Sequence, residues 1–264
     1  MLLDQIVPVI LTYDEGPNIG RCLERLTWAR EILVVDSYSN DDTVAICSRY
    51  PNARVVQRRF DSHANQWNFA LSAARDPAWV LAMDADYILT EAFLKQLTRL
   101  TPDEKTAGFR CYFRYAVFGR ILRSGLYPPV TCVFRPKGAR YVQDGHAMRV
   151  VVAGEIGSID APIMHDDRKS LDRWIETQRK YASLEASKLA SASGKLGFRD
   201  WLRTRTPLSP LAVAAYCLIV RGGLFDGKAG WYYAFQRMTA ESLICAALLD
   251  GELREADSLA HYLT

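Results

Sequence analysis

The chain lacks the sequence features that mark several large functional classes. Neither GxGxxG nor a GxxxxGKS/T pattern occurs among its 264 residues, so a dinucleotide-dependent dehydrogenase and a P-loop NTPase have no support. It has 33 basic and 30 acidic residues and a formal net charge of +3, and nucleic acid is therefore not an expected partner. Its six cysteines form no CxxC pair, which favours reduced, buried thiols over a disulfide framework.

The apolar runs near the C-terminus are too short to cross a bilayer. Residues 208–220 are mostly apolar, but a spanning helix needs about 20 such residues. The next apolar segment is interrupted by Arg237 and Glu241. At the N-terminus Asp4 interrupts the apolar start, and no basic region precedes a long apolar one, so no signal peptide is expected. These absences lead us to expect a cytoplasmic protein.

Short apolar runs alternate with helix-like segments in the first ninety residues. The apolar runs are at residues 7–11, 32–35, 53–56 and 79–83, and the helix-like segments are at residues 19–29, 43–50 and 65–74. This alternation predicts an α/β fold in which helices connect the parallel strands of a sheet. Aromatic and β-branched runs between residues 108 and 152 indicate further strands.

Acidic side chains follow three of these predicted strands. Asp14 and Glu15 follow the first, Asp36 follows the second, and Asp84 and Asp86 follow the strand at residues 79–83. Ligands of open α/β sheets bind outside the carboxyl ends of the strands. Two carboxylates spaced two residues apart suit a cation such as Mg²⁺, which takes one or two protein carboxylates and completes its shell from substrate phosphates. The pattern indicates a nucleotide site, with a pair of solvated loop acids as the alternative.

Four motifs resemble, in order, those of the inverting glycosyltransferases of family 2, which have the GT-A fold. They are ILTYDEGPNIGRCLERL, ILVVDSYSNDDTVAI, QWNFAL and WVLAMDADYIL. Near the C-terminus, RGGLFDGKAGWYYAF is similar to a terminal segment of the branch that contains lipopolysaccharide core glucosyltransferases. The resemblance implies a mixed, Rossmann-like GT-A sheet with a helical C-terminal region.

The resemblance also implies roles for individual residues. Asp86 is the expected metal ligand, and His165, which follows a predicted strand, is expected to complete the metal shell. Asp144 is the expected general base, because inverting transfer needs a group that takes the proton of the acceptor hydroxyl. The expected donor-binding residues are Thr12, Tyr13, Glu15, Asp36, Gln66, Asn68, Asp84 and Arg168.

These roles have structural alternatives. Asp36 also suits a helix cap, and Asp144 with Gly145 also forms an ordinary tight-turn dipeptide. Related enzymes carry a His-Glu pair nearby, whereas here His146 is followed by Ala147. The assignment of the base therefore stays open at this point.

We expect a GT-A catalytic domain over residues 1–168 and a helical region over residues 169–264. The apolar, aromatic-rich helices of that region are flanked by Arg199, Arg203, Arg205 and Arg221. Such a pattern is typical of helices that lie in the plane of an anionic membrane surface. A helical cap on the catalytic domain, or a dimer contact, is the alternative.

Together these features predict inverting transfer of a hexose-type sugar from a nucleotide-diphosphate donor, most simply a UDP-sugar, with Mg²⁺ or Mn²⁺. The expected acceptor is a lipid-linked glycan such as lipopolysaccharide core, and the expected location is the inner face of the cell membrane, with peripheral attachment. Two alternatives stay open. One is an enzyme that uses a polyprenyl phosphate acceptor, which needs no general base, and the other is a non-catalytic sugar-nucleotide-binding protein.

Overall fold

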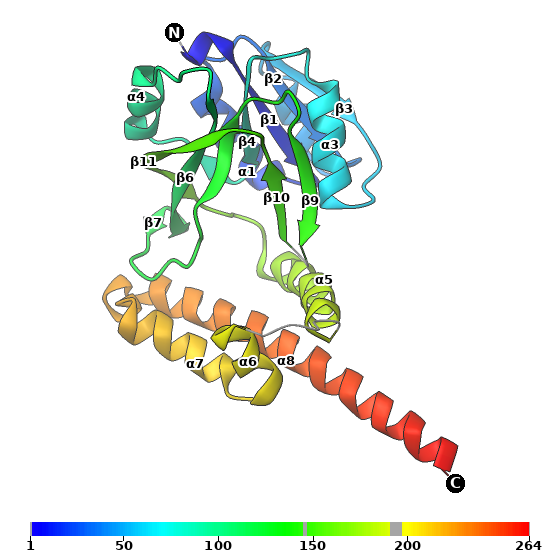
Figure 1. The fold of residues 1–264 in the computed structure, drawn as a ribbon. Coiled ribbons are helices and arrows are strands. Elements are labelled where there is room, and N and C mark those ends of the chain that lie inside the picture. The colour runs from blue at the N-terminus through cyan, green and yellow to red at the C-terminus, as the bar shows by residue number, and fades with distance from the viewer. Residues whose placement is uncertain (1, 145–146, 191–196, 264) are drawn as a thin grey trace. The chain divides into compact units, whose positions relative to one another are not determined.

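The computed structural model describes residues 2–144, 147–190 and 197–263 (Figure 1). The chain divides into two compact units. The first unit consists of Met1–Ile121 and Leu126–Lys169, and the second consists of Leu122–Gly125 and Ser170–Thr264.

The first unit alternates strands and helices before it becomes mainly strand. Its elements are the 3₁₀-helix η1 (Leu2–Gln5), β1 (Ile6–Thr12), α1 (Gly16–Leu23), the 3₁₀-helix η2 (Glu24–Leu26), β2 (Ile32–Asp36), α2 (Thr43–Cys47), β3 (Ala53–Gln57), α3 (His63–Ala73), β4 (Trp79–Asp84), β5 (Tyr87–Ile88), α4 (Glu91–Arg99), β6 (Thr106–Val117), β7 (Arg120–Ile121), β8 (Val130–Phe134), β9 (Arg140–Asp144), β10 (Ala147–Val151) and β11 (Glu155–His165).

Nine strands of the described chain form one mixed sheet. Eight follow the order β3-β2-β1-β4-β8-β6-β11-β5, and β7 pairs with β6. The block β3-β2-β1-β4 is parallel throughout, as the alternation of strands and helices predicts. Strand β8 then runs antiparallel to both β4 and β6, while β9 and β10 form a separate antiparallel hairpin. Because β1, β2 and β4 are parallel, their carboxyl ends lie at one edge, where Thr12 is in register with Asp36 and Leu11 with Asp84.

The central strands are buried on both faces, and their alternating side chains enter two hydrophobic clusters. Val34 and Leu81 belong to one cluster, which α1 and α4 cover, whereas Val35 and Val80 belong to another, which α3 and β9 cover. Figure 1 shows α3 and α4 on opposite sides of the sheet. Successive residues of a strand point to opposite faces, so the nearly continuous apolar runs are explained by this double burial.

The helices differ from their predicted bounds at their ends. Helix α1 begins at Gly16 with Pro17 in its first turn, which the fixed φ of proline favours, and it gives way to 3₁₀ geometry at Glu24. Helix α3 begins at His63 because the Ser62 side chain caps it, accepting a hydrogen bond from Asn65 N at 3.2 Å. The periodic pattern marks the buried face, whereas caps set the first residue.

The second unit is helical apart from the short segment Leu122–Gly125. Its elements are α5 (Leu171–Ala190), α6 (Phe198–Arg205), α7 (Ser209–Ala215), the π-helical turn η3 (Tyr216–Val220), the 3₁₀-helix η4 (Gly223–Asp226) and α8 (Lys228–Leu263). Asp226 attaches the short segment, since its carboxylate accepts hydrogen bonds from Arg123 N at 2.9 Å and Ser124 N at 3.3 Å. No helix among the described residues combines the length and the apolar character needed to span a bilayer.

A buried ion cluster holds α5, α6 and α8 together. Arg203 is only 6% exposed. Its Nη2 donates to Glu241 Oε2 at 2.9 Å, and its Nη1 lies 3.6 Å from Glu185 Oε1. The expectation that Arg203 meets anionic lipid is therefore wrong, because a buried carboxylate pair neutralises it inside the unit. The side chains of Arg199 and Arg205 lie outside the described part of the chain.

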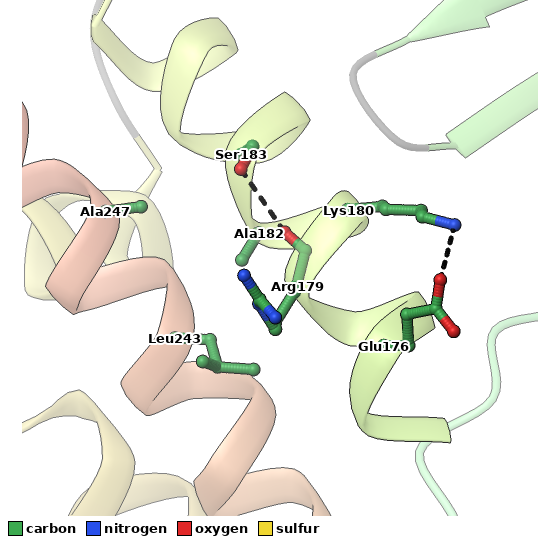
Figure 2. Close-up of a pocket in the computed structure, with 7 residues that line it drawn as sticks. All are labelled: Glu176, Arg179, Lys180, Ala182, Ser183, Leu243 and Ala247. Atoms are coloured by element: carbon green, nitrogen blue, oxygen red, sulfur yellow. Dashed lines mark hydrogen bonds and ion pairs between the residues drawn. The ribbon is translucent and has the colours of Figure 1, made fainter. Parts of the chain in front are cut away.

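A groove of about 470 Å³ runs between α5 and α8 (Figure 2). Leu243 and Ala247 line it from α8, and Arg179 and Ala182 line it from α5. It is open to solvent, and Lys180 at its edge pairs with Glu176 at 3.0 Å. The groove contains no convergent set of reactive groups.

Candidate functional site

The two acids of the DxD sequence lie at the carboxyl end of β4, where β11 also ends. Asp84 is the last residue of β4, and Asp86 follows it at 8% exposure. Strand β5 pairs with the end of β11 so that Tyr87 is opposite His165. This pairing places His165 Nε2 3.0 Å from Asp86 Oδ2. Two predicted metal-site residues, 79 positions apart in the chain, are thus brought together.

Burial and the close acids set the charge of this group. Burial, together with the charge of Asp86, raises the pKa of Asp84 to about 6. Burial also acts to raise the pKa of Asp86, but the charge and hydrogen bond of His165 outweigh it and hold that pKa at about 2. For His165, burial favours the neutral ring, yet the two aspartates raise its pKa above the ordinary value. Both acids are therefore mainly ionised at neutral pH, and Asp84 takes up a proton as the pH falls toward 6.

Two polar atoms of this group lack a hydrogen bond. Asp86 Oδ1 and His165 Nδ1 are buried and have no partner among the described residues. A buried carboxylate oxygen without a partner lowers the stability of the folded state. Such an oxygen is suited to bind a hard cation. No group of three or more His, Cys, Asp or Glu side chains in the described residues could hold a metal alone. A cation on Asp84 and Asp86 would thus take its other ligands from diphosphate and water.

Three tyrosines enclose the His165 ring. The ring centroids of Tyr115 and Tyr127 each lie 4.7 Å from that of His165, and that of Tyr87 lies 5.6 Å away. The hydroxyls of Tyr87 and Tyr127 are hydrogen bonded at 2.5 Å. Sequence reasoning missed this enclosure, because its members come from β5, β6 and a loop, and nothing in the local pattern connects them.

Glu15 lies in a second charged group next to the first. Its Oε1 accepts from Lys169 Nζ at 2.7 Å and its Oε2 from Asn18 Nδ2 at 2.8 Å. Burial raises the pKa of Glu15 to about 7, with a further contribution from Asp86. Lys169 also lies 3.3 Å from Asp167. Burial acts to lower the pKa of Lys169, but the charges of Asp86 and Glu15 outweigh it and raise that pKa. Lys169, the residue after the expected Arg168, thus carries positive charge close to both acidic groups.

Asp36 is fully buried at the end of β2, and its carboxylate is occupied by protein groups. Oδ1 accepts from Thr12 Oγ1 at 3.1 Å and from the Ser39 hydroxyl. Oδ2 accepts from Ser39 N at 3.0 Å and from Gln57 Nε2 at 3.1 Å. Asp36 therefore ties together the ends of β1, β2 and β3. Tyr13, in the adjoining loop, is 50% exposed.

The other predicted donor residues lie at or near the rim but make protein contacts. Gln66 is buried, and its Nε2 donates to Ser37 Oγ at 3.1 Å. Asn68 bonds the backbone of Tyr141 twice, with its Nδ2 donating at 3.0 Å and its Oδ1 accepting at 2.8 Å. These bonds hold β9 against α3. In this structure Asn68 therefore positions β9, and both ends of its side-chain amide are used for that contact.

Arg168 is anchored by its neighbour. Its Nη2 donates to Asp166 Oδ2 at 2.8 Å, and Arg21 Nη1 donates to the same oxygen at 2.9 Å. Two guanidinium groups therefore share one buried carboxylate. Burial acts to raise the pKa of Asp166, but the hydrogen bond of Arg168 and the charges of both arginines outweigh it and hold that pKa below its usual value. A diphosphate contact by Arg168 would compete with this pair.

The predicted base lies partly outside the described residues. Asp144 ends β9 in register with Ala147 of β10, but its side chain lies outside the described part, as do Gly145 and His146. Its role remains a prediction.

Comparison with known proteins identifies relatives over most of the chain. The family model "Glycosyl transferase family 2" matches residues 9–151. The lipopolysaccharide core biosynthesis glycosyltransferase LpsC of Rhizobium meliloti (strain 1021) is 25% identical over 268 residues, covering 96% of each chain. An uncharacterized glycosyltransferase of Rickettsia conorii is 35% identical over 91 residues, which is 34% of this chain and 32% of the relative.

A solved structure also matches. The mannosyltransferase PcManGT from Pyrobaculum calidifontis, in complex with GDP-Man and Mn²⁺, superposes with a TM-score of 0.53 at 15% identity over 93% of this chain and 87% of that chain. At this identity the similarity shows the fold.

The His165–Asp86 pair predicts a pH-dependent contribution to stability when no metal is bound. Since the folded pKa of His165 is raised above its ordinary 6.5, its stabilisation is complete below about pH 6.5 and is lost as pH rises through the folded value. We expect His165→Gln, which keeps a donor without the charge, to lower the free energy of unfolding more at pH 5.5 than at pH 9. Urea unfolding in EDTA measures the free energy of unfolding of both proteins at each pH. An equal decrease at the two pH values would show that the charge of the His165 ring contributes nothing to stability.

Proposed function

The chain belongs to glycosyl transferase family 2, whose model matches more than half of it, and from this we propose that it is a metal-dependent, inverting hexosyltransferase. It has the GT-A fold, a large mixed sheet followed by helices. The observation that carries the proposal is the rim of β4. Two acids two residues apart, half-buried Asp84 and buried Asp86 with its unpartnered oxygen, suit the cation that accompanies a nucleotide diphosphate.

We propose that the donor occupies the rim formed by the loops after β1, β2 and β4. Asp86 and Asp84 are the proposed ligands of Mg²⁺ or Mn²⁺, and His165 holds Asp86 in place from 3.0 Å. Mn²⁺ is also the ion named with the archaeal mannosyltransferase structure. When bound, the cation would neutralise charge that develops on the leaving diphosphate. Lys169, close to the same acids, supplies a second positive charge.

The nucleoside would meet the loops at the ends of β1 and β2. Tyr13 and Tyr38, each 50% exposed, are aromatic side chains of these two loops. Asp36, with Thr12, fixes the loop backbone that forms the floor. A uridine diphosphate sugar is the donor we propose. In the reaction, Asp144 takes the proton of the acceptor hydroxyl, the oxygen attacks the anomeric carbon from the side opposite the diphosphate, and the carbon–diphosphate bond breaks with inversion.

The proposed acceptor is a lipid-linked glycan such as lipopolysaccharide core. Similarity to LpsC over 96% of both chains supports this class. The second unit supports it independently, because its surface suits attachment to lipid. We therefore place the protein on the inner face of the cell membrane, attached peripherally.

The surface in question, here called the apolar patch, consists of Ile219, Val220, Leu224 and Phe225. Ile219 and Val220 are each 70% exposed and Phe225 is 76% exposed, which is unusual for large apolar side chains in one place. Positive charge surrounds the patch, since the Arg123 guanidinium lies 5.8 Å from the Phe225 ring centroid and Arg221 and Lys228 are exposed.

Asp226, the acid that directly follows the apolar patch in the sequence, is buried. Asp226 is 4% exposed, and its Oδ2 accepts the hydrogen bonds of residues 123 and 124. An apolar surface with a cationic border and an inward acid fits the headgroup region of an anionic membrane.

The metal role of Asp86 has a direct test. Asp86→Asn retains the shape and a hydrogen bond to His165 but removes the charge, so donor hydrolysis and transfer should fall about 100-fold or more, while the protein still folds at neutral pH. EDTA should stop the wild-type reaction. Asp172→Asn, at an exposed acid of α5, is the control and should behave as wild type. Full activity in EDTA, or in Asp86→Asn, would refute the metal role.

The role of Asp144 has a separate signature. Asp144→Asn should lower kcat for transfer to a hydroxyl acceptor by about 100-fold or more while leaving the donor Kd within about twofold. A parallel loss of donor binding would instead identify a structural turn. Undiminished transfer to a polyprenyl phosphate would favour the acceptor that needs no base.

Membrane attachment should depend on the apolar patch. Wild-type protein should bind vesicles that contain anionic lipid, more weakly in high salt but not to zero, because salt screens only the charges. The double variant Ile219→Glu, Phe225→Glu should bind at least about tenfold more weakly, since each buried apolar side chain contributes about 2 kcal/mol. Leu253→Glu is the matched control, because Leu253 is also 70% exposed on α8. Equal binding by the double variant and the control would exclude this surface.

A further inference from the structure

A cavity of about 580 Å³ opens beside Asp84 in the first unit. Its volume is within the range of small-molecule sites. Trp67, Tyr127 and Tyr141 provide aromatic walls, and Met148 and Val150 of β10 provide an apolar one. Since Asp84 lines this cavity and also ends β4 at the proposed donor rim, a molecule in the cavity would lie next to the donor.

Two arginines line the same cavity without a partner. Arg110 comes from β6 and Arg149 from β10, and both are exposed. No ion pair or hydrogen bond of either guanidinium is found among the described residues, whereas Arg168 and Arg21 in the same unit share the Asp166 carboxylate. Asp84 is the only acid among the described residues that line the cavity. The cavity therefore combines apolar and aromatic walls with an excess of positive charge.

Apolar walls together with two arginines fit an acceptor better than a nucleotide-sugar donor. The donor diphosphate has its cations at the rim, where Lys169 and the proposed metal lie. The guanidinium groups of Arg110 and Arg149 line the cavity beside Asp84, and they are suited to a second anion, since arginine binds carboxylates and phosphates through paired hydrogen bonds. A neutral sugar would leave both groups unused.

We propose that this cavity binds the acceptor and that the acceptor is an anionic sugar, whose carboxylate or phosphate is held by Arg110 and Arg149 while its hydroxyl is presented toward Asp84. The inference rests on the proposed function, because it assigns the substrate class of the same site. The anion is a binding group and is not the atom that is glycosylated. The apolar wall of β10 accommodates the less polar face of the sugar ring.

The test compares methyl glycosides of three kinds: a neutral hexoside, a hexoside phosphate and a hexuronate. The wild type should use one or both anionic acceptors with a KM at least about tenfold below that of the neutral one. The double variant Arg110→Gln, Arg149→Gln should raise the KM for the anionic acceptors by about tenfold or more, since a hydrogen bond to a charged group is worth about one such factor. Its KM for the neutral hexoside and its donor hydrolysis without acceptor should not change. Whether the phosphate or the hexuronate shows the larger shift identifies the anion.

Arg140→Gln is the matched control, because Arg140 lies exposed on the same β9–β10 hairpin but does not line the cavity. A second readout is independent of activity, namely the rise in Tm that each glycoside produces. If the wild type is inactive but its Tm rises with an anionic glycoside and that of the double variant does not, the proposed function fails and the anion site stands. If the double variant matches Arg140→Gln in both readouts, or if all three glycosides are affected equally, the anion site is refuted.

Discussion

Repulsion between two closely spaced carboxylates is the constraint around which the rim of this sheet is arranged. Asp84 and Asp86 leave β4 two residues apart, and burial weakens the screening by water. Two unit charges about 4 Å apart repel by roughly 4 kcal/mol at an effective dielectric constant of 20, which exceeds the roughly 1 kcal/mol of a typical net hydrogen bond. The pKa of Asp84 is raised to about 6, first by its loss of contact with water and then by the charge of Asp86. A bound divalent cation would offset the repulsion, and without one His165 neutralises only one of the two acids.

The fold supplies this arrangement from segments that are distant in the chain. The parallel strands β1, β2 and β4 bring three loops to one edge, and the charged side chains that these loops place there are acids, Glu15, Asp84 and Asp86 among them. The cations come from the far end of the unit, where β11 ends and the chain continues to Lys169. Its Nζ lies 2.7 Å from Glu15 Oε1, across 154 residues. The pairing of β5 with the end of β11 adds His165 to the same rim, opposite Tyr87.

The sequence was informative wherever the signal was local. The alternation of apolar runs predicted the parallel strands, and the acids after residues 79–83 predicted the site at their carboxyl ends. Both features can be recognised within a single short segment, because a doubly buried strand is a continuous apolar run and polar residues mark its end. Roles set by distant partners could not be predicted in this way. Asn68 was predicted to bind the donor, yet it bonds the backbone of Tyr141, and Arg203 was predicted to be a surface cation, yet Glu241 neutralises it. In both cases the deciding partner lies far along the chain, in a different element.

The distribution of positive charge also explains how one small rim can take two anionic molecules. A donor diphosphate and an anionic acceptor repel each other, and both are repelled by Asp84 and Asp86. Lys169 pairs with Glu15 and does not line the cavity beside Asp84, whereas Arg110 and Arg149 do. Each anion then has its own cations, and the acids between them can be used for the metal and for orienting the acceptor hydroxyl. If all the cations formed one cluster, the first anion to bind would neutralise them and the second anion would be repelled. Two separate groups of cations therefore allow the donor and the acceptor to bind at the same time.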